Sequence, residues 1–441
     1  MKPTKTILFT LIAFLAAVLV GAPASHAQAS QSYAITGAKV FPISGPPIDG
    51  ATVVIEKGKI TAVGKGAKIP AGAKVIDAKG LEVYPGIFNA ITEMGINEIG
   101  EGVSGSVDSS ELGEYNPQLV TATAVNPASA HIDVTRADGI THVISAMGAG
   151  GGRGGGGSVI PGQASLFNLA GWTMDEMQIR RSAAMTVNWP ALPGGGGGGR
   201  GGAAAGAGGG ATRAEYDKRI AELAEWLDRA RHYAQAKQAN ANFERDLKLE
   251  ALIPVIKGEM PLFVMANQAN QIREAVAFCD KQKVKMILAT GTAAGEVKDL
   301  LKEKNIPVVL RPTLTLVRGE DDPYDMSLTL AGELSKAGVK IAYGSFGNEF
   351  ARRITQQVGN SVAYGLPHEE GLKALTIYPA EMFGVSKELG TIEVGKMANL
   401  IVTNGDLLEL TTEVKYLFIR GMETSTDNRH RQLYEEYRKR P

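Results

Sequence analysis

The stretch "YPGIFNAITEMG", from Tyr84 to Gly95, stands between two parts of the chain that differ in pattern. Before it, runs such as "ATVVIEKGKITAVG" and "AKVIDAKGLEVYPG" break β-branched residues with Gly, Lys-Gly and Pro-Gly, which is typical of short strands joined by tight turns. After it, strand-like runs such as "GITHVISAM", "VKMILATG" and "VKIAYGS" alternate with helical segments. This alternation predicts βα units and a parallel sheet, so the stretch marks the passage from one domain to another.

The first pattern returns near the end of the chain. "GKMANLIVTNGD" and "EVKYLFIRGM" read as strands separated by turn residues, with no helix between them. The economical interpretation is a small β-domain built from both chain ends, with a parallel α/β domain inserted between its two halves. The final segment, "DNRHRQLYEEYRKRP", is expected to be a charged helix.

The beginning of the chain has the order of a secretory signal. Lys2 and Lys5 precede the apolar run "ILFTLIAFLAAVLVGA", and small residues follow in "SHAQA". This predicts a signal peptide over residues 1–29, cleaved after Ala27 or Ala29, and export to the periplasm or the extracellular space. An uncleaved anchor is the alternative, although the run is shorter than the roughly 20 apolar residues of a membrane helix.

Composition narrows the classes of partner. The chain has 44% hydrophobic and 21% charged residues, and Lys plus Arg equal Asp plus Glu at 46 each. No net charge attracts nucleic acid or an anionic membrane, so neither is expected as a partner once the signal is removed. Cys279 is the only cysteine, which excludes an intrachain disulfide and is best read as a small buried hydrophobe.

Two glycine tracts interrupt the α/β part, over residues 148–157 and 194–210. A phosphate-binding loop would need a Gly-Lys-Ser/Thr ending or a spaced glycine fingerprint, and neither tract has one. Flexible, solvated loops are the expected structure.

Four segments, in this order, carry a family resemblance. They are "GKITAVG" with "VIDAKG" and "YPGIFNA", then "SVAYGLPHEEGLKALT", "LTIYPAEMFGV" and "GTIEVGKMANLIV". With them the chain resembles the amidohydrolase superfamily, closest to its imidazolonepropionase-like branch, although Asn399 stands where Asp is usual. The resemblance implies an α/β fold with a distorted (β/α)8 barrel over 85–383. It also implies a composite β-sandwich over 30–84 and 384–422, followed by the C-terminal helix over 423–441.

The resemblance also implies a place for a metal ion. Such barrels carry their sites at the C-terminal ends of the strands. Family members hold a divalent ion such as zinc with His-x-His at the end of strand one, His after strands five and six, and Asp after strand eight. Residues i and i+2 of a strand point to the same face, so both imidazoles of His-x-His reach one ion. The ion lowers the pKa of its bound water from about 15.7 to about 7.

This sequence departs from that ligand set at every position. The matching residues are Ile91 and Glu93 in strand one, Met265 in strand five, Thr290 in strand six and Phe346 after strand eight. Only Glu93 is a strong ligand, since a thioether is soft and a hydroxyl weak for zinc-like ions. The histidines of the mature chain, His131, His142, His232, His368 and His430, all fall elsewhere. We therefore predict neither the usual metal site nor another cofactor.

Three functional interpretations remain open. The first, and favoured, one is a non-catalytic partner subunit or scaffold, in a homo-oligomer or with a catalytic amidohydrolase relative. The second is a hydrolase of amide or cyclic amide C–N bonds with a rebuilt site, in which Glu93 acts as a general base or holds one ion. The third is a small-ligand binding protein. Polar candidates for the barrel mouth are Asn89, His142, Asn267, Arg311 and Glu349. For His142 and Arg311, a structural role is the alternative.

Overall fold

The computed structural model describes residues 31–99, 104–149, 158–192, 212–240, 243–315 and 322–440. The predicted signal peptide and its cleavage sites lie outside these ranges. So do both glycine tracts, except for Gly148 and Ala149. In the described ranges no helix combines the length and apolar character that crossing a membrane requires.

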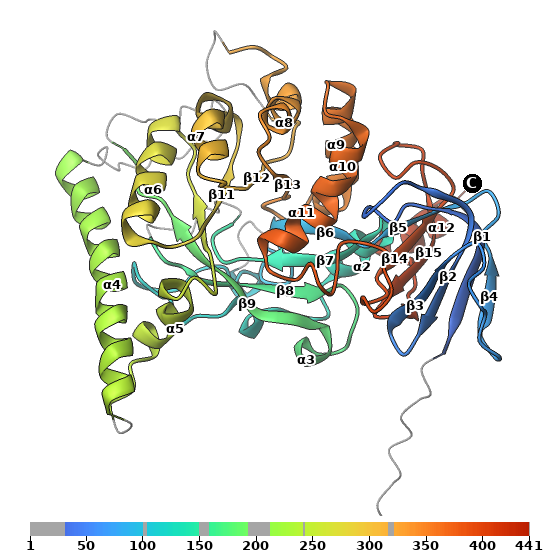
Figure 1. Ribbon diagram of the computed structural model, residues 1–441, viewed down its shortest axis with the longest axis horizontal. Coiled ribbons are helices and arrows are strands. Elements are labelled where there is room, and N and C mark those ends of the chain that lie inside the picture. The colour runs from blue at the N-terminus through green and yellow to red at the C-terminus, as the bar shows by residue number, and fades with distance from the viewer. Residues whose placement is uncertain are drawn as a thin grey trace, which may run out of the picture.

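One sheet of the described structure combines strands from both chain ends (Figure 1). Its strands are β1 (Tyr33–Val40), β2 (Ile48–Glu56), β3 (Lys59–Gly64), β4 (Lys74–Asp77), β5 (Glu82–Pro85), β14 (Leu400–Thr403), β15 (Val414–Ile419) and β16 (Met422–Glu423). Their order is β16-β15-β14-β5-β1-β2-β3, with β4 paired to β1. The two ends meet where β14 runs antiparallel to β5, with Val402 opposite Val83. Their apolar residues share one buried core.

A second eight-stranded sheet in the described ranges forms a nearly closed barrel. Its strands are β6 (Ile87–Thr92), β7 (Ile140–Ser145), β8 (Gly162–Asn168), β9 (Gln178–Asn188), β10 (Leu262–Met265), β11 (Met286–Thr290), β12 (Val308–Leu310) and β13 (Ile341–Tyr343), paired in chain order. The first and last strands approach each other, and Phe346 N donates a hydrogen bond to Ile91 O over 2.9 Å. The predicted fold class, a distorted barrel with a composite β-domain, is confirmed.

The expected parallel arrangement fails at one strand. β6 and β7 are parallel, and so are β9 to β13, but β8 runs antiparallel to both β7 and β9. A parallel connection needs a crossover of a dozen or more residues. Between β8 and β9 the chain has only the short helix α3 (Met174–Met177), so these two strands form an antiparallel hairpin.

Helices cover the outer face of the parallel strands (Figure 1). They are α4 (Arg213–Ala239), α5 (Leu247–Ile256), α6 (Ala269–Gln282), α7 (Lys298–Glu303), α8 (Met326–Lys336), α9 (Ile354–Ala363), α10 (His368–Leu375) and α11 (Ile377–Met382). Helix α2 (Ala130–Ala137) precedes β7, and α12 (Arg429–Tyr437) follows the last strand. Short 3-10 turns lie at Ser104–Ser106, Thr121–Thr123, Thr292–Val297 and Ala351–Arg353.

Sequence signals explain the start of the longest helix. Thr212 and Glu215 form a reciprocal capping box, in which the Thr212 hydroxyl accepts from Glu215 N over 3.2 Å. Such a cap satisfies backbone N–H groups that have no partner inside the helix. Tyr216, Leu223 and Leu227 then place one buried apolar stripe against the barrel.

Candidate functional site

The five positions that match the family's metal ligands lie at one end of the barrel. Ile91 is on β6 and Glu93 follows that strand, Met265 ends β10, Thr290 ends β11, and Phe346 follows β13. All five side chains are buried, with exposed fractions between 0% and 7%. They therefore occupy the C-terminal end of the strands, where barrels carry their chemistry.

Three of these positions belong to the packed interior of the barrel. Ile91, Met265 and Phe346 are members of one buried apolar cluster. The barrel strands also contribute Phe88, Leu166, Phe263, Ile287, Val309 and Ala342 to the same cluster. Ile91 and Phe346 have no donor atom for a metal, and the thioether of Met265 is a soft ligand that suits zinc-like ions poorly.

The remaining two positions do not rebuild a ligand set. Glu93 Oε2 accepts a hydrogen bond from Asn97 Nδ2 over 3.0 Å. Thr290 Oγ1 is buried without a hydrogen-bond partner in the described structure. Within the described ranges, no three His, Cys, Asp or Glu side chains come close enough together to hold an ion. Among the described residues, these five positions do not supply a ligand set for the metal that the resemblance implies.

Polar groups beside Glu93 hold the barrel seam together. Asn89 Nδ2 donates to Ser345 Oγ over 2.7 Å, and Ser345 N donates back to Asn89 Oδ1 over 3.0 Å. Thr92 Oγ1 donates to Gly347 O over 3.1 Å. Asn348 Nδ2 donates to Glu93 O over 3.1 Å and also to Asn97 O. Asn89 thus joins β6 to the loop after β13, and its amide is engaged in this seam.

The other predicted mouth residues do not converge on Glu93. Asn267 and Glu349 are exposed, in the loops after β10 and β13 respectively. Asn267 N donates to Gln271 Oε1 over 3.1 Å, at the start of α6. Arg311 follows β12, and its guanidinium lies 4.0 Å from the centre of the Phe346 ring. That cation–π contact packs Arg311 over the end of the apolar cluster.

His142 lies at the opposite end of the strands, which corrects its predicted place at the mouth. It is buried on β7, opposite Phe88 near the start of β6. Its Nδ1 lies 2.6 Å from Thr141 Oγ1 and accepts from Asn399 Nδ2 over 3.1 Å. Burial lowers the pKa of His142 to about 3, so the ring is neutral at neutral pH. It links the base of the barrel to the second half of the β-domain.

The other four histidines are spread over separate contacts. His131 donates to Glu98 O over 2.9 Å, His232 is exposed on α4, His368 lies 2.7 Å from Asp406, and His430 lies 2.7 Å from Arg352. None of these distances joins two histidines, so they form no common centre.

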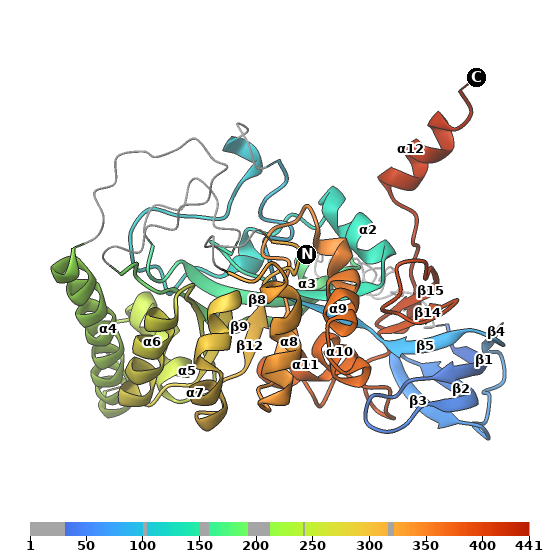
Figure 2. The ribbon, with the colours of Figure 1, turned by 90° about the horizontal axis from the view of Figure 1, so that it is seen from above.

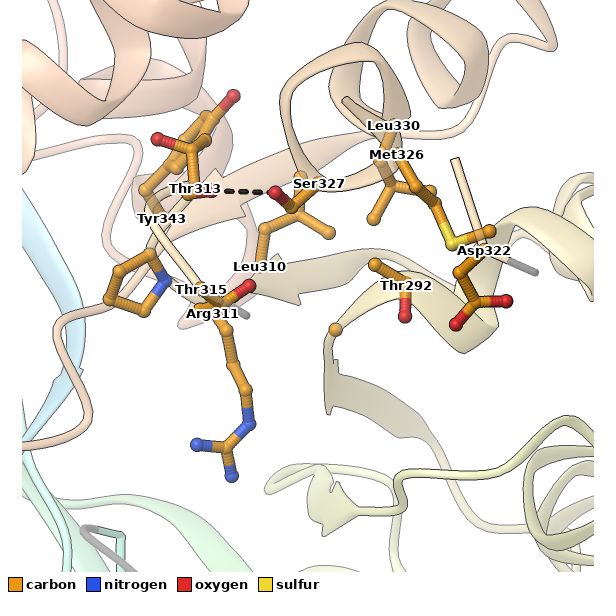
Figure 3. A pocket seen from close by; sticks show the side chains of 12 residues that line it. Thr292, Leu310, Arg311, Thr313, Thr315, Asp322, Met326, Ser327, Leu330 and Tyr343 are labelled. Atoms are coloured by element: carbon orange, nitrogen blue, oxygen red, sulfur yellow. Dashed lines mark hydrogen bonds between the residues drawn. The ribbon is translucent and has the colours of Figure 1, made fainter. Parts of the chain in front are cut away.

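A small cavity does open beside the C-terminal ends of β11 to β13 (Figure 3). Its volume is about 140 Å³, and Thr292, Leu310, Arg311, Thr313, Asp322, Met326, Ser327 and Tyr343 are among its lining residues. Sequence reasoning named only Arg311 of these, because single Ser and Thr residues after a strand carry no distinctive spacing. Figure 3 shows Arg311 extending from the end of β12, with Asp322 on the far side near Thr292 and Met326.

The polar lining of this cavity is largely engaged within the protein. Ser327 Oγ donates to Thr313 O over 2.6 Å, and Thr313 Oγ1 donates to Gln357 Oε1 over 2.6 Å. Tyr343 Oη donates to Ser361 Oγ over 2.8 Å, and burial raises the pKa of that phenol. Ligand pockets commonly measure about 300–1,000 Å³. The cavity thus has room for a few atoms rather than for a peptide-sized substrate.

Comparison with known proteins agrees with this architecture. Residues 276–424 match the sequence model of the amidohydrolase family. The crystal structure of an amidohydrolase from Thermotoga maritima MSB8 superposes with a TM-score of 0.76 at 25% identity, covering 89% of this chain and 99% of that one. The chain has the amidohydrolase fold.

Two curated proteins are more distantly similar to this amidohydrolase-fold chain. A 5-methylthioadenosine/S-adenosylhomocysteine deaminase of Thermodesulfovibrio yellowstonii is 24% identical over 197 residues, which is 39% of this chain and 43% of the relative. Amidohydrolase tasK of Hapsidospora irregularis is 22% identical over 393 residues, which is 84% of this chain and 39% of the relative. The chain thus matches about two fifths of the length of each.

Proposed function

We propose that this protein is an exported, non-catalytic relative of the amidohydrolases that serves as a partner subunit or scaffold. One observation carries the proposal: Ile91, Met265 and Phe346 fill, with buried apolar side chains, three positions where the resemblance implies metal ligands. Hydrolysis in this fold would need an activated water held at that point. The space is instead part of the hydrophobic core.

The seam contacts support the same proposal. Asn89 is hydrogen-bonded through both ends of its amide to Ser345, and Asn348 bridges Glu93 O and Asn97 O. These amides stabilise the closure between the first and last strands. A catalytic constellation would aim such groups at an open space.

A hydrolase with a rebuilt site is the second candidate. It is favoured by the hydrolytic names of the relatives and by Glu93, a carboxylate only 2% exposed at the C-terminal end of β6. In that case Glu93 would act as the general base toward water, with Asn97 orienting one of its oxygens. Ligand binding at the strand ends has less support, because the cavity there, beside β11 to β13, is small.

The deciding experiment compares three mature proteins purified without chelator: the natural chain, Glu93→Ala and Glu349→Ala. The last removes an exposed carboxylate near the same strand ends and serves as the matched control. Metal content is measured by mass spectrometry, and hydrolysis is assayed on a panel of amides, cyclic amides and dipeptides with and without added zinc. The proposal predicts no stoichiometric metal and no turnover in any of the three.

Turnover or one bound ion per chain that disappears in Glu93→Ala and persists in Glu349→Ala would overturn the proposal in favour of the second candidate. Export is tested separately by sequencing the N-terminus of the protein recovered from the periplasm or medium. The proposal expects it to begin at Gln28 or Ser30, directly after the predicted cleavage sites.

A further inference from the structure

Helix α12 stands out from the body of the molecule (Figure 2). None of the residues Arg429–Tyr437 is buried, and the side chains of Tyr434 and Tyr437 are 64% and 48% exposed. Isolated helices shorter than about 12–15 residues are marginal in water, because nucleation is unfavourable and packing usually supplies their stability. This nine-residue helix contacts α2 but buries none of its own described residues, so it has little of the packing that such a helix needs.

Only the first turn of α12 is attached to the rest of the chain by hydrogen bonds. Asn428 caps the helix, accepting from His430 N over 2.9 Å and Arg431 N over 3.2 Å. His430 Nδ1 lies 2.7 Å from Nη1 of Arg352, which belongs to the 3-10 turn Ala351–Arg353. The helix is thus held at its base, and its later residues Tyr434 and Glu435 border a surface groove against the body.

The exposed part of α12 and its end are basic. Arg429, Lys439 and Arg440 are exposed and make no ion pair with another described residue. Arg438 pairs with Glu435 inside the helix at 2.7 Å. Unpaired cations thus lie at both ends of the helix, with Tyr434 and Tyr437 between them. Arg440 lies 4.0 Å from the centre of the Tyr437 ring.

A complementary surface lies in the loop after β6. Between Lys79 and Arg136 the sequence has no lysine or arginine. In the segment 104–114, which we call the acidic loop, Asp108 and Glu111 are exposed and make no ion pair with another described residue. Between them and Glu114 lies Leu112, the side chain of which is 96% exposed.

The acidic loop has a fixed conformation. Asp108 N donates to Ile96 O over 2.7 Å, and Val107 forms an antiparallel bridge with Asn97. At its other end, Glu114 pairs with Arg219 of α4 at 3.0 Å. Docking there would not require the loop to fold first, so less ordering entropy would oppose it.

We propose that α12 of one copy packs against the acidic loop of a second copy of this chain, and the reverse. Both features rise on the same side of the body in Figure 2, as a twofold interface requires, because each copy then presents the same pair of surfaces. Arg429, Lys439 and Arg440 face Asp108 and Glu111 of the other copy. Tyr434 and Tyr437 cover Leu112. The proposal does not depend on whether the barrel is catalytic.

The test is sedimentation velocity on the mature chain and on charge variants. The natural chain is expected to be a dimer at micromolar concentration in low salt. Arg429→Glu/Lys439→Glu/Arg440→Glu, and separately Asp108→Lys/Glu111→Lys, are expected to raise the dissociation constant by at least about tenfold, which corresponds to about 1.4 kcal/mol. In the heterodimer of the two variants, opposite charges meet at both contacts, so an equimolar mixture is expected to dimerise again. A single chain that carries all five changes has the charge of both surfaces reversed and is also expected to dimerise.

Several results would overturn the proposal. The first is a natural chain that is monomeric. The second is that the two charge variants dimerise as well as the natural chain. The third is that the chain with all five changes stays monomeric although its circular dichroism spectrum matches that of the natural chain. Lys65→Glu/Lys68→Glu, on an exposed turn of the β-domain, is the control for charge change alone and should leave the dimer intact. Salt at 1 M shortens the screening length to about 3 Å and should also favour monomers.

Discussion

Replacing Gly344 by alanine tests whether the barrel is closed and filled as described. A Cβ atom at this position would lie 2.3 Å from Ile91 Cγ2 and 3.1 Å from both Ile91 N and Ile91 O. Real Cβ contacts are not this short, so β6 or the end of β13 must move. Overpacking of this kind costs about 1–3 kcal/mol of unfolding free energy.

The size of the effect can be checked by removing the obstacle. Ile91→Ala alone should cost about 2–5 kcal/mol, because it leaves a cavity in the buried cluster. In that background the new methyl at position 344 enters the vacated space, so the double variant should be more stable than the sum predicts by about 0.5–3 kcal/mol. The rescue stays incomplete, since the two 3.1 Å contacts are to the backbone of residue 91.

The assay is urea unfolding followed by both circular dichroism and tryptophan fluorescence. Coincident transitions are required before free energies are compared, because a chain with two sheets need not unfold in one step. Gly347→Ala is the matched control: nothing lies within 4 Å of its added Cβ, so its stability should stay within about 0.5 kcal/mol of the natural chain. A harmless Gly344→Ala, or strictly additive effects with Ile91→Ala, would refute the interlocked seam.

Two further predictions concern buried titratable groups. Burial lowers the pKa of His142 from 6.5 to about 3. Between these two pH values the unfolded chain binds a proton at His142 that the folded chain does not. The free energy of unfolding should therefore fall as pH drops from about 6.5 toward 3, by up to about 1.4 kcal/mol per pH unit. His142→Gln should remove this component in acid-dependent urea titrations, whereas the exposed His232→Gln should not; equal slopes in all three proteins would contradict it. Burial also raises the pKa of the Cys279 thiol to about 12, so Ellman's reagent should label it only in denaturant. Rapid labelling of the native protein would show that α6 opens there.

The sequence was informative about elements and their order. Turn residues and β-branched runs predicted a β-domain made from both ends, and alternation of strand and helix predicted βα units with a parallel sheet. The barrel was an implication of the family resemblance. The sequence pattern did not identify β8, and the expected parallel arrangement is wrong there. A strand-like pattern also leaves the direction of a strand undetermined. The direction depended on connection length, and the four-residue helix α3 is too short for a parallel crossover.

The site was predictable in its residue types and unpredictable in its contacts. The sequence placed Ile91, Met265 and Phe346 at positions where the resemblance implies metal ligands. It could not show that Asn89 bonds to Ser345, since these partners are 256 positions apart. Nor could it show that His142 lies at the base of the barrel beside Asn399, because both faces of a buried strand look alike in sequence.

The pairing of β5 with β14 has a consequence for the newly made chain. Val83 of β5 cannot pair until Val402 of β14 has been synthesised. At a translation rate of roughly 5–20 residues per second, the intervening stretch of about 315 residues takes roughly 15–60 s to make. Throughout this interval β5 presents an unpaired edge, a template for association with other nascent chains. Translation that stops before Leu400 leaves that edge permanently open. The β-domain can therefore form completely only in a chain that has been translated through β14, which covers the open edge of β5.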